Sequence, residues 1–175
     1  MVDNNEPIPA DDFVRSEGLP FMAHVLRRLS DELVQGCERW YPLFGLTAPP
    51  RTASTLHLLL RRGPQQVLQI ADALRQSHPL VITWVRQLRA LDMIATAADP
   101  ADRRRTIVSL TDRGHAEATR MLDADVVIAR AYHALLEEAD AAVFEPLWRL
   151  EATLRERSFL DRLVAAQAED QEAGR

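Results

Sequence analysis

The chain has 175 residues, of which 47% are apolar, so it is long enough for an ordinary folded domain and too apolar for wholesale disorder. Its acidic start does not resemble a signal peptide, and no apolar run is long enough to span a bilayer, so we expect a cytoplasmic protein with no membrane segment. Because Cys37 is the only cysteine, an internal disulfide is excluded.

Charge is distributed unevenly along the chain, although the formal net charge is −5. Residues 51–113 contain 10 arginines and 5 acidic residues, whereas the rest of the chain contains 11 arginines and 21 acidic residues. A basic middle therefore lies inside an acidic frame. A basic segment of this kind is the electrostatic footprint expected of a nucleic-acid-binding region.

The N-terminal part combines a polar tail with a long amphipathic helix. Residues 1–18 are expected to form a flexible acidic tail. A helix is predicted to begin after Gly18, with Pro20 in its first turn, and to end before Pro42. Its apolar residues are spaced three or four apart and form one stripe: Phe21, Val25, Leu29, Leu33, Cys37 and Trp40.

Three shorter helices are predicted next, over about residues 51–62, 65–75 and 77–91. The first of them ends at Gly63-Pro64, a pair of residues that cannot continue a helix easily. Ser77 is a suitable N-cap for the third, and Pro79 suits its first turn.

A β-hairpin is predicted to follow these helices. Residues alternate along the candidate strands 93–96 and 105–110, and the loop 97–104 between them is rich in turn-forming residues. The hairpin is expected to lead into a helix that Thr111 caps.

Two helices are predicted to complete the chain. The first runs from Thr111 towards Glu138. The second covers about residues 140–168, where Pro146 indicates either a kink or a start nearer Glu145.

The segment from Ile70 to Leu88 has the spacing of a helix-turn-helix. One face of the second helix is apolar. The other face presents Ile82 together with the candidate DNA-contacting residues, which are, from the N-cap onward, Ser77, His78, Pro79, Thr83, Arg86 and Arg89. Such a face suits a DNA major groove, where His, Thr and Arg contact base edges or phosphates. An ordinary amphipathic helix pair with a solvated polar face would give the same pattern.

An arginine run at the end of the hairpin loop favours DNA binding. Arg103, Arg104 and Arg105 directly follow Asp102. A narrow minor groove attracts an inserted arginine through its negative potential, and a neighbouring carboxylate can hold that arginine extended. The alternative is a solvated charge run, but a basic turn just after a candidate recognition helix makes DNA contact the better interpretation.

The sequence DPADRRR at residues 99–105, followed by IVSLT at 107–111 and then Gly114, resembles the wing of the MarR (multiple antibiotic resistance regulator) family. The family pattern is D-P-x-D-x-R, then a strand ending in L-T, then x-x-G. The resemblance covers about residues 19–163 and implies a mainly α fold with a small β-hairpin wing. It also implies that Asp102 braces the wing and that Arg104 reaches the minor groove.

Within this fold, a winged helix-turn-helix with N- and C-terminal dimerisation helices, the resemblance implies five parts. They are a flexible acidic tail (1–18), an N-terminal dimerisation helix (19–46), a winged helix-turn-helix DNA-binding domain (47–113), C-terminal dimerisation helices (114–168) and a flexible tail (169–175). Simple packing of the two chain ends against each other is the alternative to dimerisation.

The chain departs from the family pattern at five positions. Arg75 and Asp92 occupy turns where glycine is common, although aspartate tolerates a left-handed conformation better than most residues. Thr83 and Gln87 stand where the recognition helix often has arginines, and Thr96 replaces a common arginine of the first wing strand. These changes leave the fold prediction intact but give no inference of a familiar operator sequence.

MarR-like proteins often bind small aromatic or phenolic effectors between the dimer body and the winged domain. Five residues near that junction are candidates for such a pocket: Trp40, Tyr41, Phe44, Arg51 and His57. Core packing is the alternative for the aromatic residues among them. Cys37 lies on the apolar stripe, so we expect a buried, inert thiol rather than a peroxide sensor.

No sequence feature indicates catalysis. The 5 histidines have no metal-ligand spacing, and no phosphate-binding loop or nucleophile motif is present, so we predict no catalytic residue, metal or cofactor. The predicted function is a homodimeric DNA-binding regulator, a repressor that binds a pseudo-palindromic operator and responds to a small-molecule effector. The alternative is a protein-interaction or dimerisation module on the same fold that has lost sequence-specific DNA binding.

Overall fold

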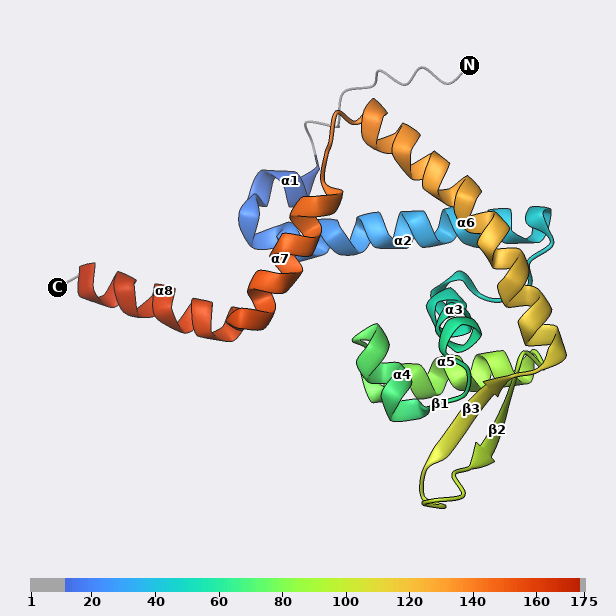
Figure 1. Cartoon of the computed structure of the whole chain (residues 1–175). Helices are drawn as coiled ribbons and strands as arrows, with labels where there is room; N and C mark the ends of the chain where they lie inside the picture. The colour runs from blue at the N-terminus through green and yellow to red at the C-terminus, as the bar shows by residue number, and fades with distance from the viewer. Residues whose placement is uncertain (1–11, 174–175) are drawn as a thin grey trace. The chain divides into compact units, whose positions relative to one another are not determined.

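Helices make up most of the chain, and one small antiparallel sheet interrupts them (Figure 1). The computed structural model describes residues 12–173, so the predictions for residues 1–11 and 174–175 lie outside the described residues. The chain divides into two units, of which the first ends at Ala124 and the second begins at Asp125. This division falls later than the boundary predicted at residue 113.

The N-terminal elements are α1 (Phe13–Glu17), the 3-10 turn η1 (Leu19–Phe21), α2 (Met22–Trp40) and the 3-10 turn η2 (Tyr41–Phe44). The helix predicted between Gly18 and Pro42 is therefore present, with tighter turns at both ends. The expectation of a flexible tail up to residue 18 is wrong for α1. The Asp12 side chain caps this helix by accepting a hydrogen bond of 3.1 Å from the N–H of Arg15.

The next helices follow the predicted order closely. They are a 3-10 turn η3 (Pro50–Thr52), α3 (Ala53–Arg62), α4 (Val67–Leu74) and α5 (His78–Ala90). Gly63 ends α3 with a φ of +72°, a conformation that glycine adopts without strain.

The sheet has three strands, one more than predicted. The hairpin strands β2 (Ile94–Ala98) and β3 (Thr106–Leu110) pair with Thr96 opposite Val108, and β1 (Gln65–Gln66) pairs with the other edge of β3. A strand of two glutamines has no alternation to detect, so periodicity could not reveal β1. Its pairing joins the start of α4 to the wing.

The core of the first unit lies between α3, α4, α5, the sheet and the start of the following helix, α6 (Asp112–Glu138). Its largest fully buried apolar side chains are Leu46, Leu56, Leu59, Ile70, Val81, Leu88, Met93, Val108 and Met121. Removing these side chains from water is the main force that fixes α5 and the hairpin relative to one another.

Helix α6 follows β3 in the chain, and its first residues pack against the turn between α5 and β2. Thr111 caps it as predicted, since its Oγ1 accepts a hydrogen bond of 3.0 Å from the N–H of Gly114 and donates one of 2.6 Å to the carbonyl of Asp92. Asp92 has a φ of +56°, the left-handed conformation expected there. The N–H of Thr111 donates to the carbonyl of Met93 at 3.1 Å. The side chain and the backbone of Thr111 therefore both bind the helix start to this turn.

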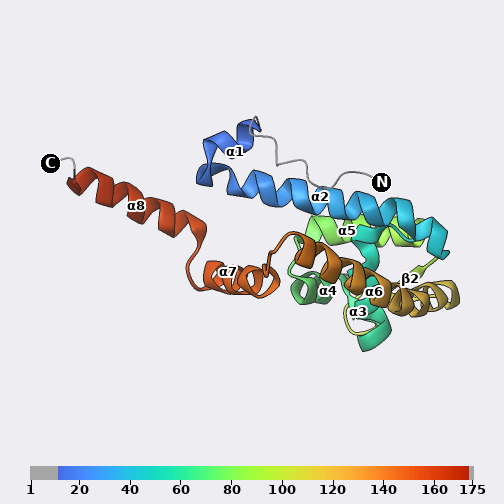
Figure 2. The same ribbon diagram turned by 90° about the horizontal axis from the view of Figure 1, so that it is seen from above.

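The second unit corrects two sequence predictions. The single helix predicted over 140–168 is two helices, α7 (Phe144–Glu156) and α8 (Phe159–Ala173), which Figure 2 shows as separate rods. Ser158 starts α8: its Oγ accepts a bond of 3.1 Å from the N–H of Asp161. A serine followed three residues later by an acidic residue is a helix-start signal that sequence reasoning missed here.

The flexible tail predicted from residue 169 is likewise helical up to Ala173. For α7, the predicted alternative of a start nearer Glu145 is confirmed, since this helix begins at Phe144.

Within residues 12–173, no helix combines the length and the apolar character that crossing a membrane requires.

Candidate nucleic-acid interface

Helices α4 and α5 form a helix-turn-helix whose turn depends on Arg75. This residue ends α4 in the left-handed conformation, with a φ of +52°. The inner face of α5 is buried through Val81, Trp84, Val85 and Leu88, as the apolar periodicity predicts. The turn and this buried face together hold the opposite side of α5 towards solvent.

The predicted recognition residues lie at the start of α5 or on its exposed side: Ser77, His78, Pro79, Thr83, Arg86 and Arg89. Ser77 occupies the N-cap position, although its hydroxyl makes no capping bond. The Thr83 hydroxyl donates a bond of 3.1 Å to the carbonyl of Pro79. Among the described residues, Arg86 and Arg89 have no polar partner, so their guanidinium groups are free for a ligand.

At the wing tip, hydrogen bonds converge on Asp102. Its Oδ1 accepts bonds from the backbone N–H and the Nε of Arg104, both at 3.1 Å, and its Oδ2 accepts one of 3.3 Å from Arg104 Nη2. Arg105 Nε lies 3.3 Å from the same Oδ2. Hydrogen bonds from the side chain and backbone of Arg104 lower the pKa of Asp102, so its carboxylate stays ionised at neutral pH.

The contact between Asp102 and Arg104 that the resemblance implies is therefore present. Arg104 remains 91% exposed while it is held, and Arg105 is 58% exposed. Arg103 is exposed and has no polar partner in the described part of the chain. The wing thus presents three accessible guanidinium groups, one of which is oriented by a fork of two hydrogen bonds.

A second carboxylate, Asp99, fastens the base of the wing to α4. Asp99 is only 7% exposed. Its Oδ1 accepts a bond of 2.9 Å from the N–H of Ala101, and its Oδ2 accepts one of 2.7 Å from the Gln66 side-chain amide. Gln66 also caps α4, since its side chain accepts from the backbone N–H of Gln69. We call the contact between Gln66 and Asp99 the clasp; sequence analysis gave it no role because the two residues are far apart in the chain.

The clasp gives a stability prediction with an internal control. In Asp99→Asn, the NH2 group of the new asparagine would face the NH2 group of Gln66, which cannot turn away because the Gln66 oxygen accepts a hydrogen bond from the Gln69 N–H. In Gln66→Glu, the new carboxylate would face the carboxylate of Asp99. Each single variant is expected to lose about 1–3 kcal/mol of unfolding free energy in a thermal or urea denaturation experiment.

The double variant Gln66→Glu/Asp99→Asn restores the hydrogen bond with donor and acceptor exchanged, because the asparagine introduced in the wing then donates and the glutamate introduced before α4 accepts. It should therefore be more stable than the sum of the two single changes predicts. Strictly additive losses would contradict the clasp.

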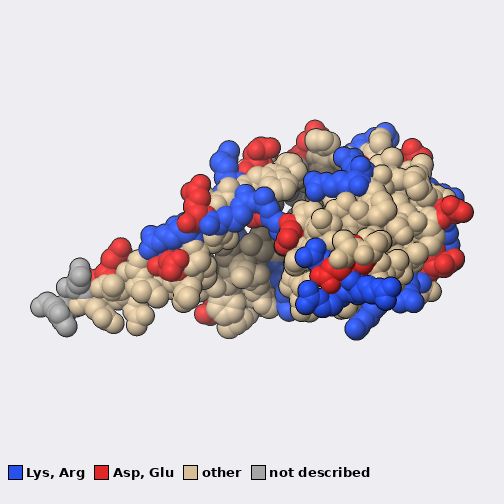
Figure 3. Space-filling view, turned by 60° about the horizontal axis from the view of Figure 1, so that its bottom comes forward, with Lys and Arg blue, Asp and Glu red and all other residues tan. Residues whose placement is uncertain are grey.

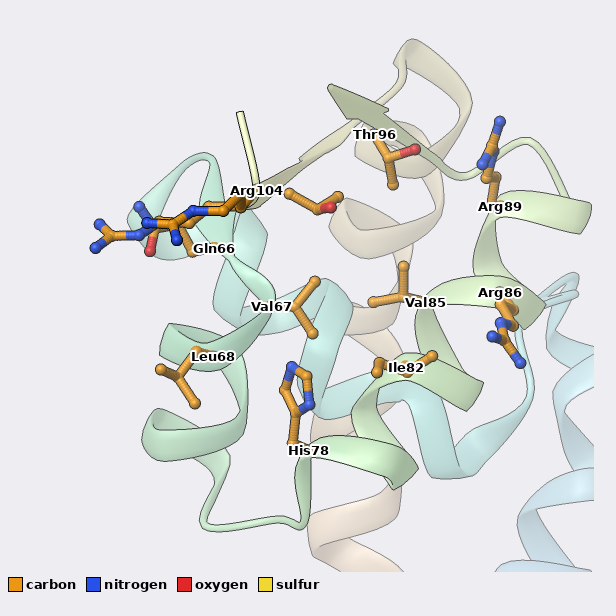
Figure 4. Close-up of a pocket in the computed structure, with 12 residues that line it drawn as sticks. Gln66, Val67, Leu68, His78, Ile82, Val85, Arg86, Arg89, Thr96 and Arg104 are labelled. Carbon is orange, nitrogen blue, oxygen red and sulfur yellow. The ribbon is translucent and has the colours of Figure 1, made fainter. Parts of the chain in front are cut away.

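A groove of about 660 Å³ joins α4, α5 and the wing into one face (Figure 4). Its lining residues are Gln66, Val67, Leu68, His78, Ile82, Val85, Arg86, Arg89, Thr96, Arg104, Arg105 and Thr106. Three predicted recognition-helix residues and two predicted wing residues therefore share one site: His78, Arg86, Arg89, Arg104 and Arg105. The other predicted DNA contacts lie outside the groove lining.

The five candidate effector residues are only partly brought together. The ring of Trp40 contacts those of Tyr41 and Phe44, with centroids 6.2 and 4.9 Å apart. Arg51 forms an ion pair of 2.7 Å with Asp31, and His57 lies half-buried on α3. Of the five, Tyr41 lines a hollow of about 580 Å³, and the other four are not in its lining. The effector pocket therefore stays a prediction.

The loop beside this hollow is held by a buried carboxylate that sequence reasoning missed. Glu117 on α6 is 5% exposed and accepts hydrogen bonds from the backbone N–H groups of Thr47 and Ala48, the latter at 2.8 Å. The sequence gives no sign of this burial, because a glutamate at such a helix position is usually solvated. Only the tertiary fold shows that it anchors the loop.

Cys37 is half-buried on α2, less enclosed than predicted. Burial raises the pKa of its thiol, so the group is protonated at neutral pH. This state agrees with the expectation of a poorly reactive cysteine.

Residues 50–114 match the family model of a winged helix DNA-binding domain, which spans η3 to the start of α6 and contains the whole groove. No curated protein sequence matches the chain.

Solved structures share the fold over most of the chain. The S. aureus MepR–DNA complex is 21% identical, covers 77% of this chain and 94% of its own, and has a TM-score of 0.58. PcaV from Streptomyces coelicolor, in complex with its natural ligand, is 22% identical, covers 75% and 92%, and has a TM-score of 0.59. BpsR from Bordetella bronchiseptica, whose DNA binding is regulated by 6-hydroxynicotinic acid, is 20% identical, covers 86% and 97%, and has a TM-score of 0.51. The predicted mainly α fold with a wing is thereby confirmed.

Proposed function

We propose that this chain, which has the winged helix fold of the MarR-type regulators and a DNA-binding domain at residues 50–114, is a homodimeric repressor of transcription. The observation that carries the proposal is the groove that joins the recognition helix to a wing with a braced arginine. A protein that acts on DNA in this way is expected to work in the cytoplasm of its cell.

In the proposed complex, α5 lies in a major groove and the wing reaches the adjacent minor groove. His78, Thr83 and Arg86 would face base edges or phosphates from α5. Arg104, held extended by Asp102, would enter the minor groove, where negative potential is strongest in narrow A·T-rich stretches. The two contacts together define one half-site.

Exposed apolar side chains support dimerisation. On α2 they are Met22, Val25, Leu26, Leu29 and Leu33; on α7 and α8 they are Phe144, Leu147, Trp148, Leu150, Leu154, Phe159, Leu160, Leu163 and Val164. Monomeric proteins seldom leave so much apolar surface in water. A second copy of the chain would cover these faces and would supply the second half-site that specific DNA binding needs.

A small aromatic or phenolic effector is the proposed signal. The DNA binding of BpsR is regulated by 6-hydroxynicotinic acid, and PcaV is in complex with its natural ligand. In this chain the ring cluster of Trp40, Tyr41 and Phe44 offers aromatic surface near the junction where the resemblance expects the pocket.

The function is tested by selection from a pool of random DNA duplexes, followed by mobility-shift titration of the enriched sequences. Sedimentation equilibrium, run first, should give twice the chain mass of 19.8 kDa. The enriched sequence should be an inverted repeat with half-site centres about 10–10.5 base pairs apart or a multiple of this spacing. A folded dimer that enriches no sequence and retards no duplex at low salt would favour the alternative, an interaction module that has lost DNA binding.

A further inference from the structure

The floor of the groove between α4, α5 and the wing is apolar. Val67 and Leu68 supply it from the first turn of α4, and Ile82 and Val85 supply it from α5 (Figure 4). Leu68 is 57% exposed, although it lies in the domain that binds DNA. Aliphatic side chains gathered at such a face are not explained by phosphate contacts.

Arginines flank this floor on both sides. Figure 4 shows Arg104 on the wing side and Arg86 and Arg89 on the α5 side. Figure 3 shows one face of the molecule, on which blue arginine side chains lie above and below a tan area, with red acidic side chains beside the lower blue group. The arginines on the α5 side suit the phosphates along one edge of a major groove, and Arg104 suits the minor groove beyond its other edge. This placement would leave base edges opposite the floor.

The helix side of the groove has few polar groups for reading bases by hydrogen bonds. Thr83, whose hydroxyl donates to the backbone of Pro79, lies outside the lining, and the Gln66 amide is occupied by the clasp. His78 is the polar, non-arginine residue that α5 contributes to the lining. Direct readout on this side therefore depends largely on apolar contact.

The major groove presents one apolar group on its base edges, the C5-methyl of thymine. We propose, resting on the proposed DNA-binding function, that Ile82 and Leu68 read thymine methyl groups, so that each half-site contains thymines facing this floor. Arg86 and Arg89 fix phosphates on the α5 side, Arg104 enters the adjacent minor groove, and the aliphatic floor distinguishes thymine from cytosine at the positions it contacts. This reading differs from the common family arrangement, in which arginines stand at the positions of Thr83 and Gln87.

Replacing thymine by deoxyuridine in the selected duplex tests the proposal directly. The exchange removes the methyl group and keeps every hydrogen-bonding group of the base pair. Each methyl that contacts the floor should weaken binding about fourfold when lost, or about tenfold or more when the same position is changed in both half-sites. Thymines outside the half-sites serve as the control and should show no effect.

A protein variant tests the same contact from the other side of the interface. Ile82→Ala should bind the thymine duplex less tightly and should no longer distinguish thymine from deoxyuridine at the position that Ile82 contacts. Leu43→Ala, which removes an 84% exposed leucine outside the groove, should behave like the wild type. Equal binding of thymine and deoxyuridine duplexes by the wild-type protein, or selected half-sites without thymine, would overturn this inference while leaving DNA binding intact. Failure to bind any duplex would instead overturn the proposed function.

Discussion

Arg104→Ala is expected to weaken operator binding by about 10- to 100-fold, because each dimer would lose two charge-assisted contacts in the minor groove. The wild-type side chain is 91% exposed and already oriented by two hydrogen bonds from its guanidinium to Asp102. Little ordering of this arginine is therefore needed on binding, which makes its loss costly. Fluorescence anisotropy with the selected duplex would measure the change.

Salt dependence separates a lost phosphate or groove contact from a damaged fold. Arg104→Ala should reduce the steepness of the fall in affinity with salt, while its melting temperature stays at the wild-type value. Asp102→Asn should give a smaller loss, since the arginine keeps its charge but loses its brace. Arg27→Ala, on exposed α2 surface, is the matched control for removing one positive charge. If Arg104→Ala binds as tightly as the wild type, the wing takes no part in recognition.

Gly114→Ala is expected to have the largest effect on stability, a loss of about 3 kcal/mol in unfolding free energy. A Cβ atom at this position would lie 1.8 Å from the carbonyl oxygen of Met93 and 2.8 Å from its carbonyl carbon. Both atoms belong to the backbone, and Thr111 fastens that turn to the helix start by hydrogen bonds. The clash therefore has no flexible side chain to absorb it.

Thermal unfolding followed by circular dichroism, at one protein concentration, measures this loss; a fall of roughly 10 °C is expected for a chain of this size. Gly36→Ala is the control, since a Cβ at Gly36 in α2 has nothing within 4 Å. That variant should be no less stable than the wild type, because alanine suits a helix better than glycine. A Gly114→Ala protein as stable as the wild type would show that α6 does not approach the Met93 carbonyl so closely.

The lack of space for a Cβ atom at position 114 explains why the wing motif ends in a glycine. The wing motif includes this glycine at a fixed distance after the L-T of the strand, and the structure accounts for it by the close approach of α6 to Met93. Local signals of this kind were readable in the sequence: the Thr111 cap, the helix periods, and the pairing of Asp102 with Arg104 across two residues.

Features that depend on residues far apart in the chain were not readable. The clasp joins Gln66 to Asp99, and Glu117 anchors the backbone of Thr47 and Ala48. Neither contact has a local pattern, because a glutamine or glutamate at such positions is usually a solvated residue. The break between α7 and α8 is different, since Ser158 and Asp161 form a local signal that the longer apolar pattern of the segment concealed.

In the proposed complex, two copies of the chain bind one DNA duplex through their grooves and wings. Titration of the selected duplex with the wild-type protein, over a series of salt concentrations, tests it most directly. The expected result is a complex of two chains per duplex whose affinity falls steeply with salt, by about 0.9 logarithmic units per tenfold increase in salt for each phosphate neutralised. A folded protein that forms no complex with any duplex at low salt, or whose binding does not change with salt, would contradict it.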